Sequence, residues 1–172
     1  MVRSGWKQPL DTSFARKRGG RWNPPGEFGV LYTCCSVAVA RAVAVEALER
    51  AGLLLADLAP EYRPSLIELA WRGEVVDLIS PGGIEAAGLP AGYPHQIRHG
   101  TTQPLGRAWH AEGLAGVVCR SASLARTGLL RWQGAHERFG EVAIFVANAT
   151  ARPALLRRRA DPSWLNPSGG SR

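Results

Sequence analysis

Gly19-Gly20-Arg21-Trp22-Asn23-Pro24-Pro25-Gly26-Glu27-Phe28-Gly29-Val30-Leu31-Tyr32 is the stretch on which the fold of this chain depends. Two glycines remove side chains just before Arg21, so another molecule can approach the main chain closely there. The Asn-Pro-Pro-Gly sequence favours a turn. After it, Val30 to Tyr32 predicts a short buried strand that ends in a phenolic hydroxyl.

A long apolar segment follows this strand, from Val37 to Leu55, and predicts a helix with Ser36 as its N-cap. Because apolar and small residues cover nearly every face, we expect the helix to pack on several sides. Its middle carries a carboxylate, Glu46. Turn, strand and helix thus place an arginine, a tyrosine and a glutamate around one site. Such a site could hold an anionic substrate at one end and stabilise a positive charge that develops at its other end.

Two motifs of the chain match a known family. The Gly-Gly-Arg-Trp-Asn-Pro-Pro-Gly motif of residues 19–26, followed by Tyr32 and an alanine-rich helix with a glutamate, resembles the RES domain. Farther along, Gly116-Val117-Val118-Cys119-Arg120-Ser121 resembles the strand-then-serine signature of the same family. The resemblance runs from about Arg3 to Phe145, which is most of the chain.

This resemblance implies a function. RES domain proteins are toxins of bacterial toxin–antitoxin pairs, and they destroy NAD by phosphorolysis or hydrolysis of the nicotinamide–ribose bond. Their fold is related to that of ADP-ribosyltransferases. The resemblance therefore implies that NAD is a substrate rather than a cofactor, with inorganic phosphate as the candidate co-substrate. It also implies an Xre-like helix-turn-helix antitoxin as partner, through which alone the protein would meet nucleic acid.

The resemblance also assigns the site residues: Arg21 and Glu46 as catalytic, and Arg3, Tyr32 and Ser121 as substrate-binding. Nicotinamide leaves NAD as a neutral molecule, so the reaction needs no general acid. One carboxylate can then suffice to stabilise the oxocarbenium-like ribose, whereas a glycosidase needs two. We expect Arg21 to hold a phosphate, because the guanidinium fork fits phosphate oxygens.

Each assignment has a structural alternative. Glu46 can form an i,i+4 ion pair with Arg50, worth only about 0.2–0.5 kcal/mol, and Glu49 is then the reserve carboxylate. The other assigned positions also have structural readings: an arginine that bonds turn carbonyls at 21, a core tyrosine at 32, and a strand-end cap at 121.

The composition limits the class of protein. The chain has 172 residues, a net charge of +7 and a pI of about 10.2, which suits one domain with an anionic partner. Three cysteines without metal-ligand spacing indicate a reducing compartment. The start of the chain has no apolar signal core, and charges interrupt its most apolar segment. We therefore expect a cytoplasmic protein without a membrane span, and a homo-oligomer is one candidate assembly.

The remaining segments predict a mixed α+β fold. Strands are predicted at residues 65–71, 74–78, 114–119 and 141–147, a helix at 101–113 and a short helix at 84–88. Together they predict one catalytic domain over residues 1–155. Residues 3–18 show no period and predict a loop, and the basic, proline-bearing residues 156–172 predict a flexible tail.

Other functions stay open at this point. The same fold can transfer ADP-ribose to a protein, and a basic chain can be a non-enzymatic nucleic-acid-binding module. His95 and His99 have the i,i+4 spacing of metal ligands, but Pro94 precedes them and no third ligand is evident. No metal site is expected.

Overall fold

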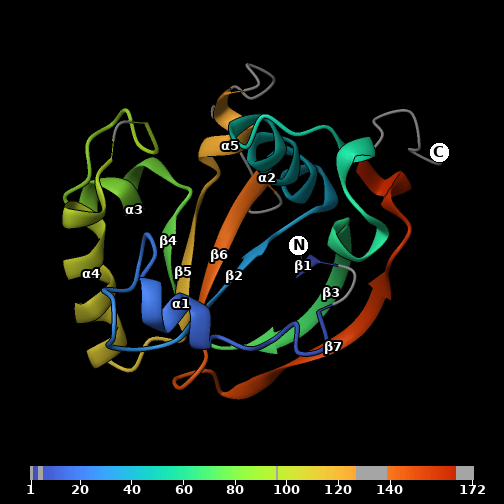
Figure 1. Cartoon of the computed structure of the whole chain (residues 1–172). Helices are drawn as coiled ribbons and strands as arrows, with labels where there is room; N and C mark the ends of the chain where they lie inside the picture. Colours follow the sequence, from blue (N-terminus) through green and yellow to red (C-terminus); the bar gives the residue numbers. More distant parts are fainter. Residues whose placement is uncertain (1, 4–5, 96, 127–138, 166–172) are drawn as a thin grey trace.

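A computed structural model describes residues 2–3, 6–95, 97–126 and 139–165 of the chain (Figure 1). Two β-sheets form its frame, and helices cover them. The strands are β1 (Val2–Arg3), β2 (Val30–Cys34), β3 (Pro64–Arg72), β4 (Val75–Leu78), β5 (Gly116–Arg120), β6 (Gly140–Phe145) and β7 (Ala151–Arg159). The helices are α1 (Ser13–Arg18), α2 (Val37–Arg50), α3 (Pro81–Ala86), α4 (His99–Ala111) and α5 (Ala122–Arg126). The mixed α+β fold expected from the sequence is confirmed.

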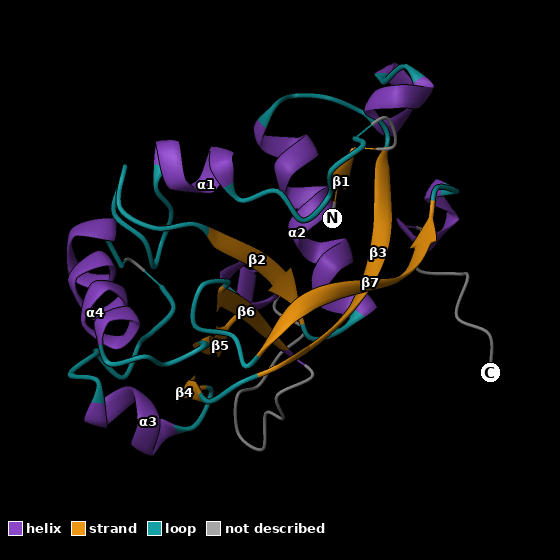
Figure 2. Cartoon of the chain, turned by 90° about the horizontal axis from the view of Figure 1, so that it is seen from below, coloured by secondary structure: helices purple, strands orange, loops and turns teal. Residues whose placement is uncertain are grey.

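The larger sheet has the strand order β2-β6-β5-β4, and only its β4–β5 pair is parallel. The smaller sheet has the order β1-β3-β7 and is antiparallel throughout. Seen from below, the long β3–β7 pair runs beside the larger sheet rather than continuing it (Figure 2). The two sheets therefore face each other across part of the molecule.

The core follows the alternation of side chains along the strands of the larger sheet. Val117 and Cys119 of β5 point to the face that α3, α4 and the loop of Trp22 cover. Val118, between them, points to the opposite face, where Trp71 of β3 packs. β2, β5 and β6 thus each supply residues to two cores, which agrees with the nearly continuous apolar character of β5 in the sequence.

The helix predicted from Val37 is confirmed. Ser36 caps it by accepting a hydrogen bond from the amide of Val39 at 3.4 Å. It ends at Arg50 rather than at Leu55, because Gly52 adopts a positive φ of 64° and turns the chain away.

Three segments differ from the predictions. Residues 13–18 form α1 instead of a loop, because Asp11 accepts hydrogen bonds from both the amide and the hydroxyl of Ser13. α4 starts at His99, two residues before the predicted start, with Arg98 as its N-cap residue. The predicted short helix lies at 81–86, since Ser80 rather than a later residue caps it.

A fourth segment, the predicted flexible tail of residues 156–172, also differs from the prediction. β7 continues to Arg159 and pairs with β3, so the basic run belongs to a sheet. Beyond it, Trp164 is buried against α2, and Nε of Arg41 donates to its carbonyl oxygen at 2.9 Å. The chain is therefore structured to Leu165, and residues 166–172 lie outside the described part.

Among the described residues, every helix is too short or too polar to cross a lipid bilayer.

The packing of α4 on the loop of Trp22 gives a testable prediction. A Cβ at Gly106 would overlap the carbonyl oxygen of Trp22, so Gly106→Ala should destabilise the fold by about 1–3 kcal/mol. Gly100 lies in the same helix and faces open space, so Gly100→Ala should be neutral or stabilise by up to about 1 kcal/mol. Denaturant unfolding measures both variants, and equal midpoints would contradict the close contact.

Candidate active site

The loop that carries Arg21 is held by the hydroxyl of Tyr32. The amide of Trp22 donates to this hydroxyl at 2.9 Å, and the hydroxyl donates to Oδ1 of Asn23 at 2.8 Å. The buried Asn23 side chain in turn donates to the carbonyl oxygen of Ala15 at 2.8 Å. One tyrosine from β2 thus fixes two consecutive residues of the loop and ties them to α1.

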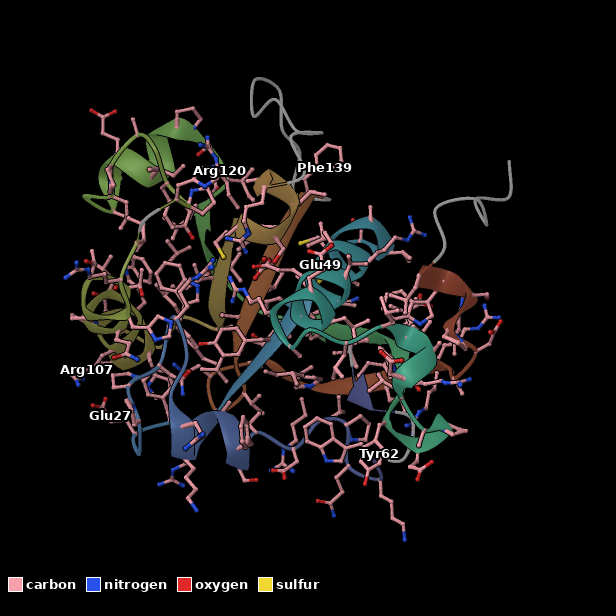
Figure 3. The ribbon with its side chains drawn as sticks, turned by 45° about the horizontal axis from the view of Figure 1, so that its top comes forward. Glu27, Glu49, Tyr62, Arg107, Arg120 and Phe139 are labelled. Carbon is pink, nitrogen blue, oxygen red and sulfur yellow. The ribbon has the colours of Figure 1, made fainter. Side chains whose placement is uncertain are left out.

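Helix α4 holds the same loop from the other side. Thr102 donates its hydroxyl to the carbonyl oxygen of Arg21, and Nε2 of Gln103 donates to that of Gly20 at 2.9 Å. On the surface, Arg107 of α4 forms an ion pair with Glu27 of the following turn (Figure 3). The main chain around Arg21 is therefore fixed before any ligand arrives, which is the condition for a preorganised site.

The side chain of Arg21 enters a cavity of about 360 Å³. Nη1 of Arg21 and the hydroxyl of Tyr93 are both buried, and the two side chains are close enough for Tyr93 to act on the pKa of Arg21. A buried guanidinium costs free energy unless its N–H groups are satisfied, and oxygen atoms of an anion satisfy them best. The cavity is therefore a candidate anion-binding site.

The electrostatic surroundings keep Arg21 charged. Burial alone would lower its pKa, but negative charge at Cys119 and Glu141 opposes this effect, and the pKa is raised overall. Burial also raises the pKa of the Cys119 thiol, so this group is neutral near pH 7. Glu141 is then the negative group that matters to Arg21 at neutral pH.

Glu141 reaches the cavity because of the register of the larger sheet. It lies opposite Cys34 of β2 on one side and opposite Cys119 of β5 on the other. Because side chains alternate along a strand, Glu141 shares its face with Ala143 of the core beneath α4. It lines the same cavity as Arg21.

Ser121 follows the last residue of β5 and is fully buried. Its hydroxyl donates to Oε1 of Glu141 at 2.6 Å and accepts from the amide of Leu124 at 3.2 Å. The structural reading of Ser121 as a strand-end cap therefore holds, and the same hydroxyl also orients a carboxylate in the cavity.

The phenol of Tyr32 stays neutral and is already engaged. Although 38% of the residue is exposed, burial of the hydroxyl raises the pKa of Tyr32 to about 12. Its hydroxyl holds the loop, as described above, while its ring lines the cavity of Arg21. The substrate-binding role assigned to Tyr32 stays a prediction, and its hydroxyl has a structural role.

Glu46 lies elsewhere, between α2 and α5. Its carboxylate forms ion pairs with Arg50 of α2 and Arg126 of α5, and it does not line the cavity of Arg21. Burial acts to raise the pKa of Glu46, but hydrogen bonding from Arg126 and the charges of both arginines lower it overall. The i,i+4 pair with Arg50 is present, and the catalytic role of Glu46 stays a prediction.

The other candidates contribute less to this site. The reserve carboxylate Glu49 is exposed on α2 (Figure 3). Arg3 lies in β1, where its backbone pairs with Pro64, but its side chain lies outside the described residues. His99 lines the cavity, whereas His95 does not. In the described part of the chain, no three His, Cys, Asp or Glu side chains gather as metal ligands would.

A second cavity of about 660 Å³ lies between the two sheets. It shares Phe14, Ala15, Tyr32 and Val142 with the cavity of Arg21, so the two spaces adjoin. Its far wall belongs to β3 and β7 and carries Arg157 and Arg159. Adjoining spaces of this size can hold an elongated ligand, since small-molecule sites commonly measure about 300–1,000 Å³.

Glu141 is the site residue that the sequence analysis missed. Its signal was weak: a carboxylate opens an otherwise apolar strand, at an even spacing from the core residues 143 and 145. Its closeness to Arg21 depends on pairing between β2, β6 and β5, which local patterns do not report.

The bond network around Tyr32 predicts the effect of removing one oxygen atom. Tyr32→Phe leaves the Trp22 amide and Asn23 Oδ1 without their partner, so stability near pH 7 should fall by about 1–3 kcal/mol. Because the folded-state pKa is raised from 10.0 to about 12, the contribution of the hydroxyl is complete below pH 10 and is lost as pH rises towards 12. Unfolding curves of both proteins should therefore converge above pH 10; a pH-independent difference would contradict this assignment.

Comparison with known proteins places the fold and the family. No curated protein matches significantly. One chain of the crystal structure of the M. tuberculosis MbcT-MbcA toxin-antitoxin complex superposes with a TM-score of 0.68. The two chains are 22% identical, over 87% of this chain and 75% of that chain, a likeness that establishes a shared fold. Residues 3–157 match the RES domain, and because the match covers most of the sequence, the chain belongs to the RES domain family.

Proposed function

We propose that this protein is the toxin of a toxin–antitoxin pair and that it destroys NAD by breaking the bond between nicotinamide and ribose. Membership of the RES domain family supports this function, as does the fold shared with a chain of a toxin–antitoxin complex. The observation that carries it is Arg21, a charged side chain that lines a cavity of about 360 Å³ from a loop fixed by Tyr32, Thr102 and Gln103. A phosphate oxygen of NAD suits such a guanidinium.

The chemistry fits the groups around the cavity. When the bond breaks, its electron pair moves to the pyridinium nitrogen, so nicotinamide leaves neutral without a general acid. Positive charge develops on the ribose, and a carboxylate beside it stabilises this charge. The ADP-ribosyl group then passes to phosphate or to water. Arg21 supplies the positive end of this arrangement, and a carboxylate supplies the negative end.

The remaining site residues take proposed roles around NAD. The ring of Tyr32 offers its face to nicotinamide, because its hydroxyl is engaged with the loop. Ser121 acts through the carboxylate of Glu141, which its hydroxyl orients. Glu46 stays a proposed catalytic group. It lies outside the cavity and forms ion pairs with Arg50 and Arg126, so one of these ion pairs would have to break before Glu46 could contact the substrate. Arg3 stays a proposed substrate-binding residue.

The cleft between the sheets offers room for the rest of the dinucleotide. With a phosphate of NAD at Arg21, the adenosine half would extend past Tyr32 into the larger cavity. Arg157 and Arg159 at its far wall would add positive charge for the pyrophosphate. NAD is the substrate in this arrangement, and inorganic phosphate is a proposed co-substrate.

The proposed partner is an Xre-like helix-turn-helix antitoxin, and the proposed compartment is the cytoplasm, where NAD is available. An antitoxin that blocks the cleft would inhibit the cleavage of NAD. A small helix-turn-helix protein encoded beside this chain, co-purifying with it and suppressing NAD loss, is the expected finding. A neighbouring protein that binds without changing NAD loss would count against this pairing.

Substitution of Arg21 tests the proposed reaction. Arg21→Gln removes the charge but keeps a similar length, and nicotinamide release from NAD should fall by about 100-fold or more, as when a preorganised donor is lost. Arg18→Gln removes the same charge from an exposed site on α1 and should leave the rate nearly unchanged. Mass spectrometry of nicotinamide and ADP-ribosyl products measures both.

Two results would contradict the proposal. Purified, antitoxin-free wild-type protein that releases no nicotinamide would remove the enzymatic function. Equal losses in Arg21→Gln and Arg18→Gln would show a general effect of surface charge instead of a specific site. ADP-ribose attached to a protein band would shift the assignment to a protein-modifying transferase on the same fold.

A further inference from the structure

The cavity of Arg21 contains its own counter-charge. Among the described residues that line it, the charged side chains near neutral pH are Arg21 and Glu141, with His99 as a further ionisable group. Tyr32 and Cys119 also line the cavity, but burial raises the pKa of both. The positive charge that would attract an anionic acceptor is therefore offset by a carboxylate of the same cavity.

One oxygen atom of this carboxylate is available for chemistry. Ser121 donates to Oε1 of Glu141, and no described residue donates to Oε2 or forms an ion pair with Glu141. Glu46 differs in this respect, because Arg50 and Arg126 both contact its Oε1. Glu141 is thus an oriented carboxylate without an ion pair, beside the group expected to hold the substrate.

The two candidate acceptors respond differently to such a carboxylate. Inorganic phosphate is a mono- or dianion near pH 7, so it would have to enter against the negative charge of Glu141. It also attacks through an oxygen that already bears charge and gains little from a base. Water is neutral, and it must lose a proton as its oxygen attacks the ribose, which a carboxylate at hydrogen-bond distance accepts.

We propose that Glu141 selects water as the acceptor of the ADP-ribosyl group and acts as its general base, an inference that rests on the proposed cleavage of NAD. The bond between ribose C1″ and the nicotinamide nitrogen breaks, and its electron pair stays on the nitrogen. The water oxygen bonds to C1″, and its proton passes to Oε2 of Glu141. The products are nicotinamide and ADP-ribose, and Glu141 returns its proton to solvent. Ser121 is a positioning residue for the carboxylate.

The ratio of products with and without phosphate tests this assignment. Full-length wild-type protein, incubated with NAD and millimolar inorganic phosphate, should yield mainly ADP-ribose and little ADP-ribose 1″-phosphate by mass spectrometry. Glu141→Gln keeps the shape and an oxygen for the Ser121 bond, but removes charge and basicity. Hydrolysis should fall by about 100-fold or more, and the share of the phosphorylated product should rise by about tenfold or more.

Two further variants separate catalysis from folding. Glu141→Asp keeps the charge and should retain a product ratio close to wild type, even where its rate is lower. Glu85→Gln makes the same amide substitution at an exposed position of α3, outside both cavities, and should change neither rate nor ratio. Thermal unfolding checks that each variant is folded, and the product ratio is independent of the amount of active protein.

Each outcome decides the inference. Wild-type protein that makes mainly ADP-ribose 1″-phosphate would overturn it while leaving the proposed NAD cleavage intact. A Glu141→Gln variant with reduced rate but an unchanged product ratio would also overturn it, because a merely structural glutamate lowers both reactions together. Absence of nicotinamide from wild-type reactions, with or without phosphate, would instead refute the proposed function and this inference with it.

Discussion

One hydroxyl group, that of Tyr32, holds the loop on which the site depends. It accepts from the amide of Trp22 and donates to the side chain of Asn23, so the residues that follow Arg21 cannot shift independently of β2. Gly20 is needed for the same reason, since a Cβ there would overlap the Tyr32 hydroxyl. The close packing of Tyr32 therefore explains why the motif has a glycine at position 20, in addition to the access that this glycine gives to a ligand.

This constraint gives the cavity its chemical character. A guanidinium held half-buried on a fixed loop loses hydration, and the free energy of that loss is recovered when it binds an anion. Glu141, brought from a different strand, limits the cost by supplying opposite charge in the same space. A cavity with one charge of each sign can bind a phosphate of NAD at one end and stabilise a ribosyl cation at the other.

Local patterns predicted much of the fold but less of the site. The helix from Val37, the strand predicted at 114–119 and observed at Gly116–Arg120, and the placement of Arg21 beside Tyr32 follow from periodicity, capping and turn chemistry. The carboxylate that shares the cavity does not: Glu46 is expected there, yet α2 presents it to Arg50 and Arg126. Pairing between distant strands brings Glu141 there instead.

The ends of the chain show the same limit of sequence patterns. The basic composition of Arg157-Arg158-Arg159 predicts a flexible tail, but pairing with β3 makes this run a strand. Helix α1 is only 6 residues long, too short for a hydrophobic period to be visible. Pairing with β3 orders β7, and hydrogen bonds from Ser13 to Asp11 precede α1. α1 lines both cavities, and β7 lines the larger one.

The central claim is that the fixed loop directs Arg21 at the anionic part of NAD. A crystal structure of the full-length protein with ADP-ribose, which is a product and is not cleaved further, tests it most directly. A phosphate oxygen within hydrogen-bond distance of the Arg21 guanidinium, with the terminal ribose facing Glu141, is the expected result. ADP-ribose bound at another surface, with the Arg21 cavity holding only water, would contradict the claim.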